Sequence, residues 1–149
     1  SGYANSFYRY GRPMLTDPLM AQDASYIARY SLLTQLRGIV PESQKMIVSR
    51  AGYQYALHAK GYVLTANPIV PLMNLPLAQV GPALAEMHVA ALCTEPDFWD
   101  GRYFSHSTLS DYLNSLPPEQ IVDDGTMRVY LVDASLVGKL KLPEAKPEE

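Results

Sequence analysis

The pattern of apolar and polar residues along the chain first becomes regular after residue 16. Asp17 followed by Pro18 is typical of a helix start, because aspartate caps a first turn and proline at the first helical position loses no hydrogen bond. One helix face then gathers the apolar residues Met20, Ala24, Ile27, Ala28, Leu32 and Leu36. Gly38 suits the left-handed residue that commonly ends a helix. We therefore predict a first helix that ends at Gly38.

Two more helices are predicted in the middle of the chain. The first spans Glu42–Lys60 and ends at Gly61, although Gly52 weakens it and a break or hairpin around 53–63 is the alternative. Its inner face would hold Met46, Ile47, Ala51, Tyr55 and Ala59. The second spans Pro82–Cys93 and is ended by the sequence Thr-Glu-Pro that follows it. Its inner face would hold Leu84, Met87 and Ala91.

A short helix and a strand are predicted nearer the C-terminus. Ser107 or Thr108 caps the helix. Its apolar side chains recur at helical spacing, at Leu109, Tyr112, Leu113 and Leu116. The turn sequence Asp123-Asp124-Gly125 then precedes a strand over 127–132. A last helical turn is expected over 134–139.

The strand over 127–132 requires a partner, because one strand cannot satisfy its own backbone groups. Residues 62–65 are the candidate, since tyrosine, valine, leucine and threonine suit strands. With about four helices and this small sheet, the sequence predicts a helix-rich α+β domain over 16–141. The aromatic and basic residues 1–15 would form an arm. The Pro/Glu/Lys-rich residues 142–149 would form a disordered tail or a linker.

The stretch from Gly61 to Ala85 carries no charged side chain and is long enough to span a bilayer. Its four prolines would leave backbone groups unpaired in lipid, which argues against a transmembrane helix. The part Asn67–Pro76 is expected to be extended. It is either buried under the helices or exposed as an apolar strip.

Composition narrows the class of protein. The 149 residues are 48% apolar and 18% charged, which suits one folded domain and excludes a disordered chain. A single cysteine excludes an internal disulfide framework and a Cys-rich zinc site. The chain shows no signal peptide, so we expect a cytoplasmic location, with a leader or anchor upstream of Ser1 left open. Its two ends fit either a processed start or a domain cut from a longer protein.

Charge is distributed unevenly along the chain. Residues 1–60 carry seven basic and three acidic side chains, whereas residues 61–149 carry five and twelve. Either the two halves attract each other within one domain, or the basic part contacts an acidic partner. The overall charge of −3 argues against nucleic-acid binding.

The candidate reactive side chains are Cys93, His58, His88 and His106. The histidines lack metal-ligand spacing, and no common cofactor motif is present, so neither a metal nor a cofactor is predicted. Cys93 falls near the C-terminal end of its predicted helix, where the helix dipole raises the pKa of a thiol. An inert, buried cysteine is therefore expected. A small enzyme that uses a Cys93–His106 pair is an alternative.

The loop Arg102–Thr108 gives a second enzymatic alternative. Its residues Tyr103-Phe104-Ser105 are similar to the Tyr-Phe-Ser run of ADP-ribosyltransferase sites, but the His-Gly-Thr element of that family is missing. The similarity therefore does not assign the chain to that family. Aromatic anchoring of a loop next to a helix cap explains the run more simply.

The sequence as a whole favours a non-enzymatic protein–protein interaction domain, cut from a larger protein such as a bacterial assembly protein. Eleven tyrosines support this prediction, because tyrosine suits interfaces. The partner would be another protein or a second copy of the chain. A single-stranded nucleic-acid-binding module that uses the arm is a further alternative. The candidate partner-binding residues are Ile69, Val70, Leu72, Met73, Tyr8, Arg9, Tyr10 and Arg12.

Overall fold

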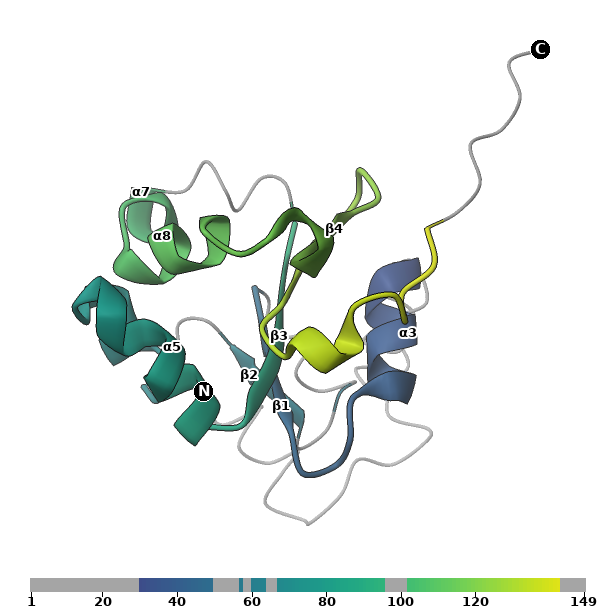
Figure 1. The fold of residues 1–149 in the computed structure, drawn as a ribbon, viewed down its shortest axis with the longest axis horizontal. Helices are drawn as coiled ribbons and strands as arrows, with labels where there is room; N and C mark the ends of the chain where they lie inside the picture. Colours follow the sequence, from purple (N-terminus) through teal and green to yellow (C-terminus); the bar gives the residue numbers. More distant parts are fainter. Residues whose placement is uncertain (1–29, 50–56, 58–59, 64–66, 96–101, 143–149) are drawn as a thin grey trace, which may run out of the picture.

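The computed structural model places a five-stranded mixed sheet between two layers of helix (Figure 1). It describes residues 30–49, 57, 60–63, 67–95 and 102–142. Of the residues predicted to form the arm and the tail, only Leu142 lies within these ranges. The chain is therefore of the mixed α and β class that its sequence predicts.

Helices and strands are mixed along the chain. They are α3 (Ser31–Ile39), β1 (Lys45–Val48), β2 (Gly61–Val63), the 3-10 helix η2 (Val70–Asn74), α5 (Leu77–Glu86), β3 (Val89–Thr94), α7 (Arg102–Ser105), α8 (Thr108–Asn114), the 3-10 helix η3 (Pro118–Gln120), β4 (Ile121–Asp123), β5 (Arg128–Leu131) and the 3-10 helix η4 (Ala134–Leu136).

The strand order across the sheet is β2-β1-β3-β5-β4. β1 pairs in parallel with β2 on one side and with β3 on the other. Helix α5 lies in the connection that leads from β2 to β3. β5 pairs antiparallel with β3 and with β4. The turn between β4 and β5 contains Gly125, whose φ of 88° is a left-handed conformation that glycine adopts without strain.

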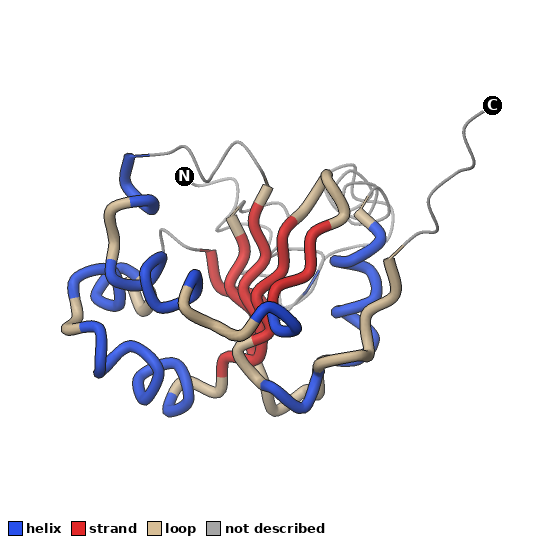
Figure 2. Tube along the Cα trace, turned by 45° about the horizontal axis from the view of Figure 1, so that its top comes forward, coloured by secondary structure: helices blue, strands red, loops and turns tan. Residues whose placement is uncertain are grey.

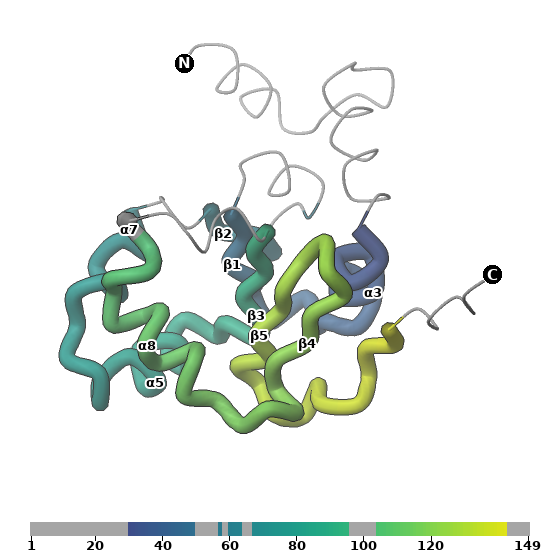
Figure 3. Tube along the Cα trace, turned by 90° about the horizontal axis from the view of Figure 1, so that it is seen from above, coloured from purple at the N-terminus to yellow at the C-terminus, as the bar shows by residue number. Residues whose placement is uncertain are grey.

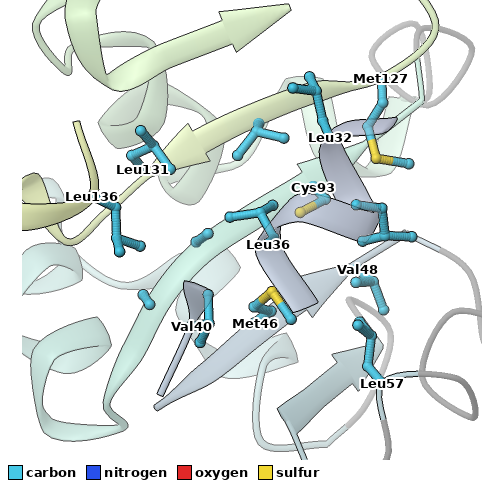
Figure 4. Close-up of a cluster of buried hydrophobic side chains, with 14 residues drawn as sticks. Leu32, Leu36, Val40, Met46, Val48, Leu57, Cys93, Met127, Leu131 and Leu136 are labelled. Atoms are coloured by element: carbon cyan, nitrogen blue, oxygen red, sulfur yellow. The ribbon is translucent and has the colours of Figure 1, made fainter. Parts of the chain in front are cut away.

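Helix α3 covers one face of the sheet, and α5, α7 and α8 lie on the other side (Figures 2 and 3). The interface under α3, here the α3 core, buries Leu32 and Leu36 against strand residues such as Met46 and Cys93 (Figure 4). These side chains have no exposed surface. Burial of such apolar surface contributes roughly 25 cal/mol for each Å² removed from water.

The opposite interface, here the α8 core, joins four helical elements, η2, α5, α7 and α8, to the sheet. Its buried residues are Ile69, Leu72, Met73, Val80, Leu84, Phe104, Leu109 and Leu113, together with Ile47, Val89, Leu92 and Tyr130 of the strands. Helices α5 and α8 approach closely at Gly81, because a Cβ atom there would lie 3.0 Å from the ring of Tyr112. A side chain at this crossing would therefore require the Tyr112 ring to shift by a few tenths of an ångström.

Helix α8 confirms the prediction made from its apolar spacing. It spans Thr108–Asn114, and the hydroxyl of Ser107 accepts a hydrogen bond of 3.0 Å from the amide of Ser110. Leu109 and Leu113 are fully buried. The predicted turn at 123–125, the strand within 127–132 and the helical turn after 133 are also confirmed.

The helix predicted over 42–60 is wrong at its start, where the chain forms β1. Met46, Ile47 and Val48 are all fully buried, because a central parallel strand is covered on both faces. Such a strand has no polar side that would reveal a period of two. Leu57 lies in a helical turn, and most of the remaining stretch lies outside the described residues. Gly61 begins β2 instead of ending a helix.

The helix predicted over 82–93 is also wrong in most of its length. Helix α5 begins earlier, at Leu77, and ends at Glu86, after which Val89–Thr94 forms the fully buried central strand β3. His88 makes the turn between them with a left-handed φ of 58°. Among the described residues the longer helices are thus α3, α5 and α8, in place of the four predicted.

Two local predictions about chain conformation are corrected as well. Asn67–Pro76 was expected to be extended, but Val70–Asn74 forms the 3-10 helix η2. Gly38 was expected to end a helix in the left-handed conformation, but α3 ends at Ile39 with an extended Val40. The ammonium of Lys60 donates to the carbonyl oxygens of Arg37 and Val40 at 3.2 and 3.0 Å, which satisfies the helix end without glycine.

The strand predicted at 62–65 exists as β2, but it is not the partner of β5. Two strands, β1 and β3, lie between them. The neighbours of β5 are β3, whose strand character was missed, and β4, which the short run Ile121–Asp123 forms.

Candidate functional site

The carboxyl edge of the parallel strands is the place where an open sheet of this kind offers a site. After β1 the chain continues to β2 on one side of it, and the next parallel strand, β3, lies on its other side. The strand order therefore reverses between β1 and β3. Open sheets with such a reversal bind ligands outside the carboxyl ends of the two strands, because the connections diverge there.

One row of apolar side chains crosses the sheet just below this edge. Ile47 pairs with Tyr62 and Leu92, Leu92 pairs with Tyr130, and Tyr130 pairs with Ile121. All five side chains belong to, or pack against, the α8 core. This row, here the apolar row, faces α5 and α8.

The next row toward the carboxyl edge is polar. Thr94, Arg128 and Asp123 lie two positions from Leu92, Tyr130 and Ile121, so alternation places them on the same face. The register pairs Thr94 with Arg128 and Arg128 with Asp123.

Ser49 completes this row on the β1 side. It follows Val48, the last residue of β1, whose partner is Cys93, and the register continued by one residue places it beside Thr94. Ser49, Thr94, Arg128 and Asp123 are here called the polar row.

The two hydroxyl groups of the polar row are buried without a partner. Thr94 is fully buried, and neither its Oγ1 nor the Oγ of Ser49 has a hydrogen-bond partner among the described residues. A buried hydroxyl without a partner costs about 1–3 kcal/mol, and native structures keep few of them. Two such groups at the ends of β1 and β3, where the strand order reverses, therefore call for an explanation.

The other half of the polar row is an ion pair at the surface. The Nε of Arg128 donates to Oδ2 of Asp123 at 2.8 Å, and the two side chains are 38% and 36% exposed. Hydrogen bonds from Arg128 to Asp123 and Tyr130 raise the pKa of the guanidinium further. The second carboxylate oxygen of Asp123 accepts from the amide of Gly125 at 2.8 Å. The pair is thus fixed to the β4–β5 turn.

Tyr130 links the polar row to helix α8. Its hydroxyl donates to Oδ1 of Asn114 at 3.0 Å, and burial raises the pKa of the phenol. The phenol is therefore neutral at physiological pH, and it holds α8 against the sheet directly beneath Arg128. Glu95 follows Thr94 just past the end of β3, and the residue is 8% exposed.

The residues of the Asn67–Pro76 strip that were predicted to contact a partner are mostly buried in the core of this domain. Ile69, Leu72 and Met73 are buried in the α8 core, and Val70 is half-buried. The other candidates, Tyr8, Arg9, Tyr10 and Arg12, lie outside the described residues. Binding of a partner protein by the arm stays a prediction.

The structure does not bring Cys93 and His106 together. Cys93 is fully buried in the α3 core (Figure 4), whereas His106 is exposed between α7 and α8, on the other side of the sheet. Burial raises the pKa of the Cys93 thiol to about 12. His88 is exposed as well, instead of lying at the core edge, and His58 lies outside the described residues.

The described ranges show neither a metal-ligand cluster nor a membrane-spanning helix. Within them, no three His, Cys, Asp or Glu side chains gather as metal ligands would. No described helix is long and apolar enough to cross a membrane.

The residues of the polar row were not singled out from the sequence. A signal existed, because Ser49 and Thr94 each follow directly on an apolar run, Met-Ile-Val and Val-Ala-Ala-Leu-Cys. Polar residues that end buried strands are typical of binding sites in open sheets. The signal was lost because both runs were interpreted as parts of helices.

Comparison of the chain with protein-family models, curated proteins and solved structures finds no match. The function must therefore be argued from the site itself.

Proposed function

We propose that this domain binds a small polar molecule at the polar row. The observation that carries the proposal is the pair of neighbouring buried hydroxyls, on Ser49 and Thr94, that have no hydrogen-bond partner among the described residues. They lie at the strand ends where the sheet order reverses.

The cost of burying the hydroxyls of Ser49 and Thr94 favours a ligand-binding role for them over a structural one. Alanine and valine would occupy these two positions without the cost of an unpartnered hydroxyl, since the neighbouring rows are apolar. Buried polar groups without partners in native proteins call for an explanation, and a ligand that supplies the partners is one. A structural hydroxyl elsewhere in the chain behaves differently: that of Ser107 donates to Phe104 at 2.6 Å and accepts from Ser110.

The polar row differs in exposure from one strand to the next. Its exposure increases across the sheet, from the buried Thr94 to Arg128 and Asp123, each more than a third exposed. The row therefore combines partly exposed charged groups with buried hydroxyls that have no partner among the described residues.

Nuclear magnetic resonance titration tests this proposal. The ¹⁵N-labelled chain is titrated separately with D-glucose, inorganic phosphate, acetate and methylammonium, which represent four chemical classes. At least one probe is expected to shift the amide signals of Ser49, Thr94 and Arg128 in a saturable way. The Thr94→Val variant should weaken that response by about tenfold, because it removes one hydrogen bond to the ligand and keeps the side-chain shape.

The matched control is Thr34→Val. Thr34 lies on the exposed side of α3, which covers the opposite face of the sheet, and its hydroxyl donates to the carbonyl of Tyr30. This variant should leave the titration unchanged. If none of the four probes shifts the polar-row amides, the proposed function is wrong.

A further inference from the structure

We infer that the molecule bound at the polar row is neutral and polyhydroxylated, a sugar or a related polyol. This inference rests on the proposed function and names the chemical class of its ligand. It follows from the charges along the row and from the hydrogen-bonding capacity of the groups there.

The charges of the polar row offset one another. The positive charge of Arg128 lies 2.8 Å from the carboxylate of Asp123. An oxyanion such as a phosphate would therefore face at least as much negative as positive charge, and it would have to compete with Asp123 for Arg128.

A cationic ligand fits no better. Among the described residues no cluster of three carboxylate, histidine or cysteine side chains is available for a metal ion. The carboxylate of Asp123 already accepts from Arg128 and from the amide of Gly125. The row thus lacks an uncommitted charge of either sign.

The hydrogen-bonding groups of the row match a ligand that carries several hydroxyls. A hydroxyl group both donates and accepts, and so do the hydroxyls of Ser49 and Thr94. Next to them the row supplies a donor, Arg128, and an acceptor, Asp123. Neighbouring strands lie about 4.8 Å apart, a distance that one sugar ring can bridge with two of its hydroxyls. A polyol can therefore satisfy both buried hydroxyls without bringing a charge.

The four-probe titration distinguishes the ligand classes. D-glucose should shift the amides of Ser49, Thr94 and Arg128, whereas phosphate, acetate and methylammonium should not. Thr94→Val should weaken the glucose response by about tenfold, which corresponds to one hydrogen bond, and Thr34→Val should not change it.

Two results overturn this inference in different ways. Saturable shifts with phosphate, acetate or methylammonium, and none with glucose, would show that the polar row binds a ligand of another class, and the proposed function would stand. A response to glucose that is as strong in Thr94→Val as in the wild type would show that the sugar binds elsewhere. If none of the four probes shifts these amide signals, both the inference and the proposed function are wrong.

Discussion

The apolar row and the polar row lie two residues apart along the strands, on the same face of the sheet. They differ in burial and in whether their polar groups have hydrogen-bond partners. In the apolar row, Ile47, Leu92 and Tyr130 are fully buried, and the only polar tip among these three, that of Tyr130, is bonded to Asn114. In the polar row, two buried hydroxyls have no described partner and the other two side chains are partly exposed. The first row is organised to stabilise the domain.

The difference teaches that the same backbone register serves two purposes. Pairing of β1, β3 and β5 fixes both rows at once, so the stable core also positions the polar groups. Substitutions in the apolar row should therefore reduce stability. Substitutions in the polar row should affect binding and leave stability nearly unchanged.

The largest effect is expected in the apolar row. Leu92→Ala should lower the free energy of unfolding by about 2–5 kcal/mol, because it leaves a cavity between β3 and the helices of the α8 core. The measurement is chemical denaturation, with Leu77→Ala as the control. Leu77 is half exposed, so its truncation should change the stability by no more than about 0.5 kcal/mol. Equal losses in the two variants would show that the apolar row is not a packed core.

A smaller loss is expected where a buried hydroxyl does have partners. Ser107→Ala should cost about 1–2 kcal/mol, because Ser107 caps α8 and bonds to Phe104. Ser49→Ala should cost far less in the same denaturation experiment. If both serines cost the same, the contrast between partnered and unpartnered hydroxyls does not hold.

The ion pair of the polar row should contribute little to stability. Arg128→Gln removes a pair whose side chains are more than a third exposed, so we expect a loss of about 1 kcal/mol or less. Added salt should reduce the stability of the wild type and leave that of the variant less affected. Urea unfolding at low and high ionic strength measures this. A loss above about 2 kcal/mol would mean that Arg128 holds the sheet together.

The turn that carries Asp123 should give a mild dependence of stability on pH. Burial raises the pKa of Asp124, but hydrogen bonds from Thr126 and Met127 outweigh it and hold that pKa below the ordinary 3.8. The stabilisation is therefore complete well above pH 3.8 and is lost as the pH falls through the folded-state pKa. Asp124→Asn should flatten this part of the stability profile. A profile unchanged by the substitution would exclude Asp124 as its source.

The parts of the fold that the sequence predicted correctly are those with a clear local pattern. Helix α8 has an apolar stripe and a serine cap, and the β4–β5 turn has a glycine that its left-handed conformation requires. The strands β1 and β3 have no such pattern. Both are buried on two faces, so their apolar runs fit a helix stripe as well as a strand.

The candidate site could not be predicted because it depends on pairing between distant strands. Ser49, Thr94 and Arg128 become neighbours only through the register of β1, β3 and β5. Nothing in the local sequence of any one of them specifies that register. The sequence instead indicated the strip around Leu72 and Met73, whose apolar side chains are buried in the α8 core.

The central claim is that the hydroxyl of Thr94 binds a ligand and does not stabilise the fold. The direct test is the free energy of unfolding of Thr94→Val, alone and combined with Ser49→Ala, measured without added ligand. We predict that both variants are as stable as the wild type or more stable, because each removes a buried hydroxyl that has no described partner. A loss of more than about 1 kcal/mol in Thr94→Val would show that its hydroxyl is already hydrogen-bonded in the folded chain, and would contradict the account.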